Sequence, residues 1–540
     1  MRPSSNLSAH VPQSTLALCR RHRPAVLTAV MVLLGSATGL TAAEFKVRWI
    51  GLLDDEGNRS QAQAINHEGV VVGWSGQETG SMMTWMRGFL WTPSTGRVAL
   101  GSLHPEGNSA GQAINAGGTI VGWSNLAPPP EGELGLERAF TCTAGIMTAL
   151  PVPPPGGGEW PSRALGLNAA GKIVGDVGST SGTSAFLFDG SLIPLPGLGG
   201  TGSTAEDISD QDVIVGSAVD GLNRRRACRW IAQVPEDLGT FGGHESWAYC
   251  VNESGAVVGW AETMAGRRRA FLREPGGTGL IDLGVLLGTE SEARGINVHG
   301  HVVGFSGGSA FLYRNGQLLD LNDLIPPEIG HLHVALDIND QGQIVGAGTY
   351  SGLQQAFVLT PITPLRMRAV ASRRDHGAAG TFDVPLPLEG PHGVECRMGA
   401  GLTLVFTFND GPSATDGTLD CSEVSTTAGT CTSVTVEGER LRVSLSEVAP
   451  NQCLSVSLAG LRSSSGGALT GSSSVILKVL PGDATNDGVV NIVDLNEVKG
   501  DLFQSVAAEN FRSDVNADGA INIVDLNDTK ANLFATTPCQ

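Results

Sequence analysis

Most of the chain consists of short apolar runs separated by turns that contain glycine, asparagine or proline. One phrase, Ala-x-x-Ile-Asn-x-x-Gly-x-Ile-Val-Gly, occurs seven times with minor changes between residues 62 and 346. A fixed period of this length is typical of repeat proteins, and one four-stranded propeller blade takes about 40 to 45 residues. The asparagine of the phrase falls at Asn66, Asn115, Asn168, Ser209, Asn252, Asn297 and Asn339.

Each copy of the phrase predicts a β-hairpin that is followed by two more strands. In the first copy, Ile65 and residues 70–72 are strand formers on either side of residues 66–69, which include asparagine and glycine. Both residue types tolerate positive φ, so these four residues are predicted to form a turn. A third strand follows at residues 88–91, and a fourth short strand ends at Leu100-Gly101.

The two ends of the repeat region are predicted to close a ring. The last copy stops after its third strand, at residues 359–361, and an orphan strand, residues 47–52, precedes the first copy. If the orphan strand joins the last copy, residues 44–362 form a seven-bladed β-propeller without a long exposed sheet edge. A linear β-solenoid is the alternative, but it would not need a displaced strand.

Residues 363–481 are predicted to form a β-sandwich-like connector, because short strands with alternating apolar positions run through them. Four cysteines lie in this segment: Cys396, Cys421, Cys431 and Cys453. In a secreted domain they predict two disulfides with three possible pairings. A zinc site is the rival, and no Cys-x-x-Cys pair or suitably spaced histidine supports it.

Two twelve-residue segments near the C-terminus, residues 483–494 and 514–525, match the spacing of a calcium loop. Calcium takes six to eight oxygen ligands, from loop positions 1, 3, 5, 7, 9 and 12, and position 6 is glycine. Gly488 and Gly519 fall at position 6. The predicted ligands are Asp483, Thr485, Asp487, the carbonyl of Val489, Asn491 and Asp494, and then Asp514, Asn516, Asp518, the carbonyl of Ala520, Asn522 and Asp525.

A helix is predicted after each loop, and none precedes the first loop. A loop with one helix, in two copies and with Asp at position 12, resembles a type I dockerin over residues 482–535. The resemblance implies two Ca²⁺ ions and a cohesin domain as partner. It also implies partner contacts by Ile492, Val493, Ile523 and Val524, with Lys499 and Lys530 either at the rim of that surface or simply solvated. The alternative for the four apolar residues is packing in the domain's own core.

The N-terminus and the repeats both indicate an exported protein. Residues 1–43 combine a basic cluster, an apolar run and small residues before Glu44, which is the pattern of a secretory signal peptide. An uncleaved anchor is the alternative. The phrase Ile-Asn-x-x-Gly-x-Ile-Val-Gly resembles the HAF extracellular repeats of bacterial secreted proteins, which implies a secreted or cell-surface location and no particular activity.

Composition narrows the classes of partner. The 540 residues include 34 Lys and Arg against 53 Asp and Glu, a formal net charge of −19. This balance argues against nucleic acid or an anionic membrane surface as the main partner, and it is compatible with cation binding. After the signal peptide no apolar run is long enough to span a membrane, so no membrane insertion is expected.

The leading hypothesis is a secreted calcium-binding interaction protein, whose propeller displays a binding surface and whose dockerin attaches it to a cohesin-bearing scaffold or cell surface. The alternative is a polysaccharide-degrading enzyme, a glycosyl hydrolase or lyase, that its dockerin delivers. Such an enzyme needs two carboxylates about 5 to 9 Å apart. The sequence contains many acids but cannot place two of them together, so no catalytic residues are predicted. A polysaccharide or glycan is a possible ligand under either hypothesis.

Overall fold

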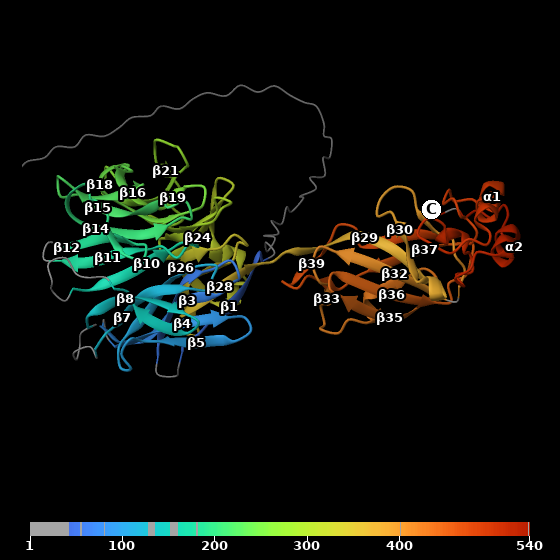
Figure 1. Cartoon of the computed structure of the whole chain (residues 1–540), viewed down its shortest axis with the longest axis horizontal. Coiled ribbons are helices and arrows are strands. Elements are labelled where there is room, and N and C mark those ends of the chain that lie inside the picture. The colour runs from blue at the N-terminus through green and yellow to red at the C-terminus, as the bar shows by residue number, and fades with distance from the viewer. Residues whose placement is uncertain are drawn as a thin grey trace, which may run out of the picture. The chain divides into compact units, whose positions relative to one another are not determined.

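The computed structural model describes residues 43–539, apart from 54–56, 80–81, 128–134, 152–159, 180–181, 400 and 538. The predicted signal peptide therefore lies almost wholly outside the described residues. The described chain is mainly β, as predicted, and its two α-helices lie near the C-terminus (Figure 1). No helix in these ranges is both long and apolar enough to cross a membrane.

The repeat region folds into seven four-stranded antiparallel blades, one for each copy of the phrase. The first three blades are β2 (Arg59–Ile65), β3 (Val71–Thr79), β4 (Met82–Thr92) and β5 (Gly96–Gly101); β6 (Ser109–Ile114), β7 (Ile120–Asn125), β8 (Glu137–Thr143) and β9 (Ile146–Ala149); and β10 (Ser162–Leu167), β11 (Ile173–Ser179), β12 (Gly182–Phe188) and β13 (Leu192–Pro194).

The next three blades have the same order: β14 (Gly199–Ile208), β15 (Ile214–Asp220), β16 (Arg225–Ile231) and β17 (Val234–Asp237); β18 (Gly242–Val251), β19 (Val257–Thr263), β20 (Arg268–Arg273) and β21 (Ile281–Asp282); and β22 (Ser291–Ile296), β23 (Val302–Ser306), β24 (Ser309–Arg314) and β25 (Gln317–Asp320). The seventh blade contains β26 (His331–Ile338), β27 (Ile344–Tyr350) and β28 (Leu353–Pro361). The first strands of neighbouring blades contact one another, and β26 contacts β2. The blades therefore form a closed β-propeller.

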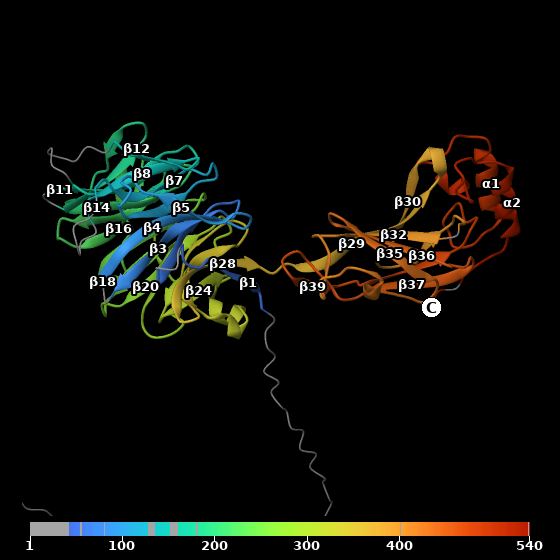
Figure 2. The ribbon, with the colours of Figure 1, turned by 90° about the horizontal axis from the view of Figure 1, so that it is seen from below.

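The closing strand of the ring is β1 (Phe45–Trp49), which pairs antiparallel with β28 from Phe45 opposite Pro361 to Trp49 opposite Phe357. In Figure 2 the blue β1 lies beside the yellow β28. The prediction that an N-terminal strand completes the last blade is confirmed. The strand lies about two residues earlier than predicted, because Gly51 takes a positive φ of 78° and turns the chain away.

The last glycine of the phrase is explained by one close approach inside each blade. Each first strand carries a register shift one residue after its alanine position, as between Ala62 and Ala64. At that point the second strand passes so close that a Cβ on Gly73 would lie 2.0 Å from the carbonyl oxygen of Gln61. The same clash, at 1.9–2.0 Å, would occur at the equivalent glycines: Gly122, Gly175, Gly216, Gly259, Gly304 and Gly346.

The turn asparagine has two roles. The Asn66 side-chain oxygen accepts a hydrogen bond from the backbone N–H of Val70 (2.9 Å), which holds the predicted turn. Its amide nitrogen donates to the backbone oxygen of Asn115 in the next blade (3.2 Å). The same inter-blade bond is made by Asn115, Asn168, Asn252, Asn297 and Asn339, and the bond of Asn339 returns to Asn66. Ser209 is too short to reach the next blade, so the series lacks one bond.

Residues 364–479 form two sheets that enclose one hydrophobic core, to which Phe406, Val443, Leu454 and Leu477 contribute. One sheet contains β29 (Pro364–Asp375), β30 (Thr381–Leu386), β32 (Gly401–Phe408), β33 (Ser413–Ala414), β35 (Thr430–Glu437), β36 (Arg440–Ser446), β38 (Leu461–Arg462) and β39 (Gly467–Thr470). The other contains β31 (Gly393–Glu395), β34 (Val424–Thr426), β37 (Gln452–Leu458) and β40 (Ser474–Val479). Helices α1 (Ile492–Asp501) and α2 (Ile523–Ala531) follow and contact each other.

The predicted pairing of the four connector cysteines among themselves is wrong. Cys421 pairs with Cys431, but Cys453 pairs with Cys539, and Cys396 is buried and unpaired. The strand order explains this, because β31, which precedes Cys396, and β37, which carries Cys453, lie on opposite sides of β40. Two strand spacings amount to about 9 to 10 Å, which exceeds the reach of a disulfide.

We predict that Phe45→Ala destabilises the propeller by about 3 to 5 kcal/mol, the usual cost of removing a buried phenylalanine side chain. Phe45 is 4% exposed and belongs to the core that the sixth and seventh blades share. Lys46→Ala is the control, because Lys46 lies on the same strand and is exposed. Scanning calorimetry should show a lower melting temperature for Phe45→Ala alone. Equal melting temperatures for the two variants would refute a stabilising role for the closing strand.

We also predict a specific thiol map for the protein exported from cells. A non-reducing tryptic digest should contain the Cys421–Cys431 and Cys453–Cys539 cross-links. Cys396 should react with an alkylating reagent only after denaturation, because burial raises the pKa of its thiol to about 12. Alkylation of Cys396 in the native protein, or a cross-linked peptide that contains it, would contradict the structure.

Candidate metal centre

Each of the two C-terminal loops ends in the cap of the helix that follows it. Asn491, at position 9 of the first loop, is the N-cap of α1, and its side chain accepts from the backbone N–H of Val493 (2.7 Å). Asp494, at position 12, accepts from the backbone N–H of Asn491 (2.9 Å). The second loop repeats this reciprocal capping with Asn522 and Asp525. Loop and helix are therefore one local unit, because the same side chains serve both.

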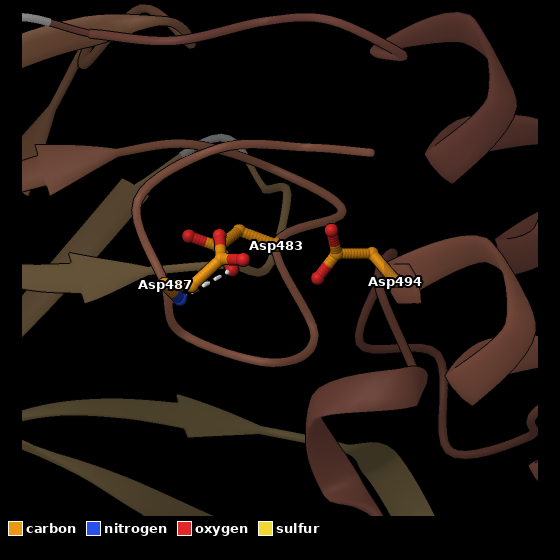
Figure 3. Close-up of side chains that lie close together, drawn as sticks. All are labelled: Asp483, Asp487 and Asp494. Atoms are coloured by element: carbon orange, nitrogen blue, oxygen red, sulfur yellow. Dashed lines mark hydrogen bonds between the residues drawn. The ribbon is translucent and has the colours of Figure 1, made fainter. Parts of the chain in front are cut away.

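The first loop brings three carboxylates together. Oxygens of Asp483, Asp487 and Asp494 all lie within 4.8 Å of one another (Figure 3). Asp483 and Asp494 are fully buried, and Asp487 is exposed. Burial, together with the Asp494 and Asp487 carboxylates, raises the pKa of Asp483 to about 6 despite hydrogen bonds from the backbone of Gly488 and Asp487. Placing several carboxylates close together in a partly desolvated site costs free energy unless a cation compensates their charge.

The second loop has the same construction. Asp514 and Asp525 are fully buried. The Oδ1 atom of Asp514 accepts from the backbone N–H of Asp518 (3.1 Å), and its Oδ2 atom accepts from the backbone N–H of Gly519 (2.9 Å). Asp483 makes the equivalent bonds to Asp487 and Gly488 in the first loop. The backbone bonds of the position-1 aspartate are therefore alike in the two loops, whereas among the described residues only the first loop brings three carboxylates within 4.8 Å of one another.

The remaining predicted ligands are oxygen atoms on the same loops. Thr485 is exposed, and its hydroxyl donates to Asp494 Oδ1 (2.8 Å). Asn516 donates from its amide nitrogen to Asp518 (3.1 Å). The carbonyl oxygens of Val489 and Ala520 accept from the amide nitrogens of Asn491 and Asn522. A donor set made only of carboxylate, carbonyl, amide and hydroxyl oxygens has the chemistry that a hard divalent cation prefers.

The four apolar residues at loop positions 10 and 11 lie on the surface. Their exposed fractions are 60% for Ile492, 54% for Val493, 54% for Ile523 and 47% for Val524. The alternative that they form the core of this region does not agree with these values. Lys499 and Lys530 are also exposed, on α1 and α2. Adjacent exposed apolar residues at equivalent places in both copies are candidates for contact with a partner.

Two exposed phenylalanines also occupy equivalent positions in the two copies, and the sequence alone did not single them out. Phe503 and Phe534 are 81% and 83% exposed, and each has a φ of 67°. The backbone N–H of Phe503 donates to Ile521 (2.8 Å), and that of Phe534 donates to Val490 (2.7 Å). Their separation of 31 residues, the same as that of the two loops, was the available sequence signal.

An acidic pair lies between two neighbouring blades of the propeller, where Asp176 is buried and Glu206 is half-buried. Glu206 on β14 accepts a hydrogen bond from the indole of Trp247 (2.9 Å). Asp176 on β11 accepts from the hydroxyl of Thr204 (3.4 Å) and pairs with Arg163 (2.9 Å). Desolvation, together with the Asp176 carboxylate, raises the pKa of Glu206 to about 7. The sequence could not reveal this pair, because the two residues belong to neighbouring blades.

Comparisons with known proteins support no family assignment. No protein-family model matches the chain, and no curated protein matches it. Similar solved structures include the extracellular domain of a hybrid two-component system from B. thetaiotaomicron, TolB from Acinetobacter baumannii, and the β-propeller domain of the Trilobed protease from Pyrococcus furiosus. Their sequence identities are 11%, 8% and 12%, and their TM-scores are 0.36, 0.31 and 0.37.

The matched regions cover 81%, 53% and 56% of this chain, and 58%, 63% and 95% of the three similar chains. This chain therefore spans less than two thirds of the first two structures. The assignment of a propeller rests on the topology of the seven blades and on the closing strand.

Proposed function

We propose that the protein is a secreted calcium-binding interaction protein that docks through its C-terminal region. In this proposal residues 363–481 are a β-sandwich connector, and residues 482–535 are a dockerin that binds two Ca²⁺ ions and a cohesin domain on a scaffold or cell surface. The observation that carries the proposal is the pair of loops in which position-1 and position-12 aspartates are buried together. The propeller is the display or ligand-binding module.

Calcium is the cation that best fits the two loops. Each loop offers carboxylate, hydroxyl or amide, and carbonyl oxygens at the six positions that calcium loops use, with glycine at position 6 in positive φ (88° at both Gly488 and Gly519). The soft ligands that zinc prefers do not occur at these positions. Binding is expected to offset the repulsion among the buried aspartates and so to stabilise the C-terminal region.

The exposed apolar residues support a protein partner for this region. Ile492, Val493 and Phe503 come from the first loop–helix copy, and Ile523, Val524 and Phe534 come from the second. Exposed apolar and aromatic residues are the kind that is enriched in the centres of protein–protein contacts. Because the two copies carry the same pair at positions 10 and 11, the dockerin is expected to present two similar faces.

Several features support an extracellular location. Two disulfides join Cys421 to Cys431 and Cys453 to Cys539, and such bonds persist in oxidising compartments. The N-terminal pattern of a signal peptide and the resemblance of the blades to HAF repeats agree with export. The proposal therefore places the mature protein outside the cell or at its surface.

A polysaccharide-cleaving propeller is the second candidate function, and the Glu206–Asp176 pair is the observation that favours it. A carboxyl group that stays protonated near neutral pH can act as a general acid, while a second carboxylate acts as base or nucleophile. If this function holds, Glu206→Gln should abolish product release from polysaccharides in a chromatographic screen. Glu274→Gln, at an exposed position on the propeller, is the control. Binding of glycans without products would support a display module instead.

The calcium hypothesis predicts a stoichiometry of two. Isothermal titration calorimetry on the full mature chain, freed of metal by chelator, should show about two Ca²⁺ sites, as expected for two complete loops. Asp487→Ala and Asp518→Ala, at position 5 of the first and second loop, should each remove one site. Thr485→Asp should tighten the first site, because a carboxylate is a stronger ligand than a hydroxyl. Glu497→Gln, an exposed acid on α1 outside the loops, should change nothing.

The absence of calcium binding by the unsubstituted chain would reject the dockerin interpretation and, with it, the cohesin partner. Retention of two sites in Asp518→Ala would show that the cation does not bind where the loops predict.

The docking hypothesis predicts that both copies must be altered to abolish partner binding. Ile492→Asp or Ile523→Asp alone should leave binding to a matching cohesin largely intact, because the other face remains available. The double variant should lose at least tenfold in affinity, since a charge in an apolar contact centre costs about 1.4 kcal/mol or more. Surface plasmon resonance against a panel of type I cohesins in calcium would measure this.

Leu222→Asp is the control for the docking experiment, because Leu222 is an exposed propeller residue (72% exposed). Unchanged binding by the double variant would show that the partner surface does not include positions 10 and 11.

A further inference from the structure

The two loops differ in what the rest of the chain places against them. The second loop meets His376, which directly follows β29: the imidazole Nδ1 lies 2.6 Å from Asp514 Oδ2, and both side chains are fully buried. The backbone of His376 is also close, since a Cβ on Gly519 would lie 2.3 Å from its carbonyl oxygen. Within the described residues, the Asp483 carboxylate of the first loop accepts hydrogen bonds only from its own loop.

The partners of His376 determine where its proton sits. The guanidinium of Arg397 approaches the imidazole Nε2 at 3.1 Å. A guanidinium can only donate, so Nε2 must accept and cannot carry a proton. The ring proton is therefore on Nδ1, from which it donates to Asp514 Oδ2. Asp514 is therefore the acceptor of this hydrogen bond.

Arg397 is itself held firmly in the β-sheet region. Its guanidinium donates to both carboxylate oxygens of the buried Glu395 (2.8 and 2.9 Å) and to the carbonyl oxygens of Ser372 (3.1 Å) and Phe382 (3.0 Å). The ring of Phe382 meets His376 edge-on, with centroids 5.3 Å apart. The position of the imidazole is thus set by groups that lie outside the loop.

We propose that His376 is a positioning residue for the second metal loop. It orients Asp514 and so makes the second site bind its cation more tightly than the first. The inference rests on the calcium binding proposed above. Because His376 and the backbone N–H of Gly519 both hold Oδ2, the Oδ1 atom of Asp514, which accepts one bond from the backbone N–H of Asp518, has a fixed orientation and a second lone pair that would bind the cation. Fixing a ligand through a second hydrogen-bonded residue reduces the conformational entropy that is lost when the cation binds.

The arrangement also couples the loop to the sheets. His376 connects β29 with β30, and the backbone N–H of Met398, just after Arg397, donates to the carbonyl of Val515 in the loop. A cation that fixes Asp514 should therefore also hold the β29–β30 connection. Just before the first loop the backbone N–H of Gly482 donates to the carbonyl of Cys396 (2.8 Å), but among the described residues no buried side chain of the sheets bonds to Asp483, and the group nearest to a Cβ on Gly488 is the flexible side chain of Lys478.

The test measures each site alone in the full mature chain. Asp487→Ala leaves only the second site and Asp518→Ala leaves only the first, so calorimetry with CaCl₂ reports one affinity in each background. His376→Leu should weaken the second site by about 10- to 100-fold, the usual effect of losing such an outer hydrogen bond. The first site should change less than about twofold, within the limit for independent positions. His376→Asn retains an amide N–H near the position of Nδ1 and should recover part of the loss.

Three outcomes would overturn the proposal: no change at the second site, equal weakening of both sites, or an equal loss with His376→Asn and His376→Leu. If His376→Leu does not fold, hydrogen exchange of the unsubstituted chain tests instead whether the cation is coupled to His376. Residues 376–386 should exchange more slowly in calcium than in chelator, and an unchanged rate overturns the coupling. If the unsubstituted chain binds no calcium at all, the proposed function itself fails, which is a different result from binding that His376 does not influence.

Discussion

The hydrogen bond from one turn asparagine to the backbone of the next blade is the interaction on which the propeller depends. Each blade is a small sheet whose apolar side chains need the neighbouring blades to cover them, as the cores shared between adjacent blades show. The asparagine fixes the local turn and the distance to the next blade with the same side chain. The amide nitrogen of Asn339 in the last blade donates to the backbone oxygen of Asn66 in the first blade. The ring is therefore closed by the same contact that joins one blade to the next.

The C-terminal region is governed by a different constraint, which is the burial of like charges. Asp483, Asp494, Asp514 and Asp525 are all fully buried. Their backbone hydrogen bonds relieve only part of the desolvation, so the pKa of Asp483 and that of Asp525 remain raised. Under the proposed function a bound cation would supply the missing compensation, so the metal and the proposed docking surface are expected to depend on each other.

The β-sheet region is more than a spacer between the other two parts. It supplies His376, held by Arg397, to the second loop, and its Cys453 forms a disulfide with Cys539, the last cysteine of the sequence. This explains why the two loops, nearly identical in sequence, have different surroundings. The loops and helices are therefore expected to depend on residues 364–479 for full stability.

The sequence alone predicted the features that arise from local chemistry. The period of the blades, the turn asparagine and the two helices after the loops follow from strand propensity, turn chemistry and capping, which act over a few residues. The closing strand pairs with a distant partner, but it could be predicted because the last copy lacks a fourth strand and an unpaired strand precedes the first copy. The ligand positions and the repeated pairs Ile492-Val493 and Ile523-Val524 could likewise be identified by spacing. What the metal and the partner are remains a proposal from that spacing.

Only the tertiary structure decided features in which distant segments meet. The strand order of β31, β40 and β37 separated Cys396 from Cys453, and the return of the C-terminus brought Cys539 to Cys453 instead. The Glu206–Asp176 pair, the exposure of Phe503 and Phe534, and the bond from His376 to Asp514 also depend on packing between elements. His376 and Asp514 are 138 residues apart in the chain, so no local pattern could connect them. Sequence periodicity reports which face of an element is apolar, whereas contacts between elements depend on how those faces are packed together.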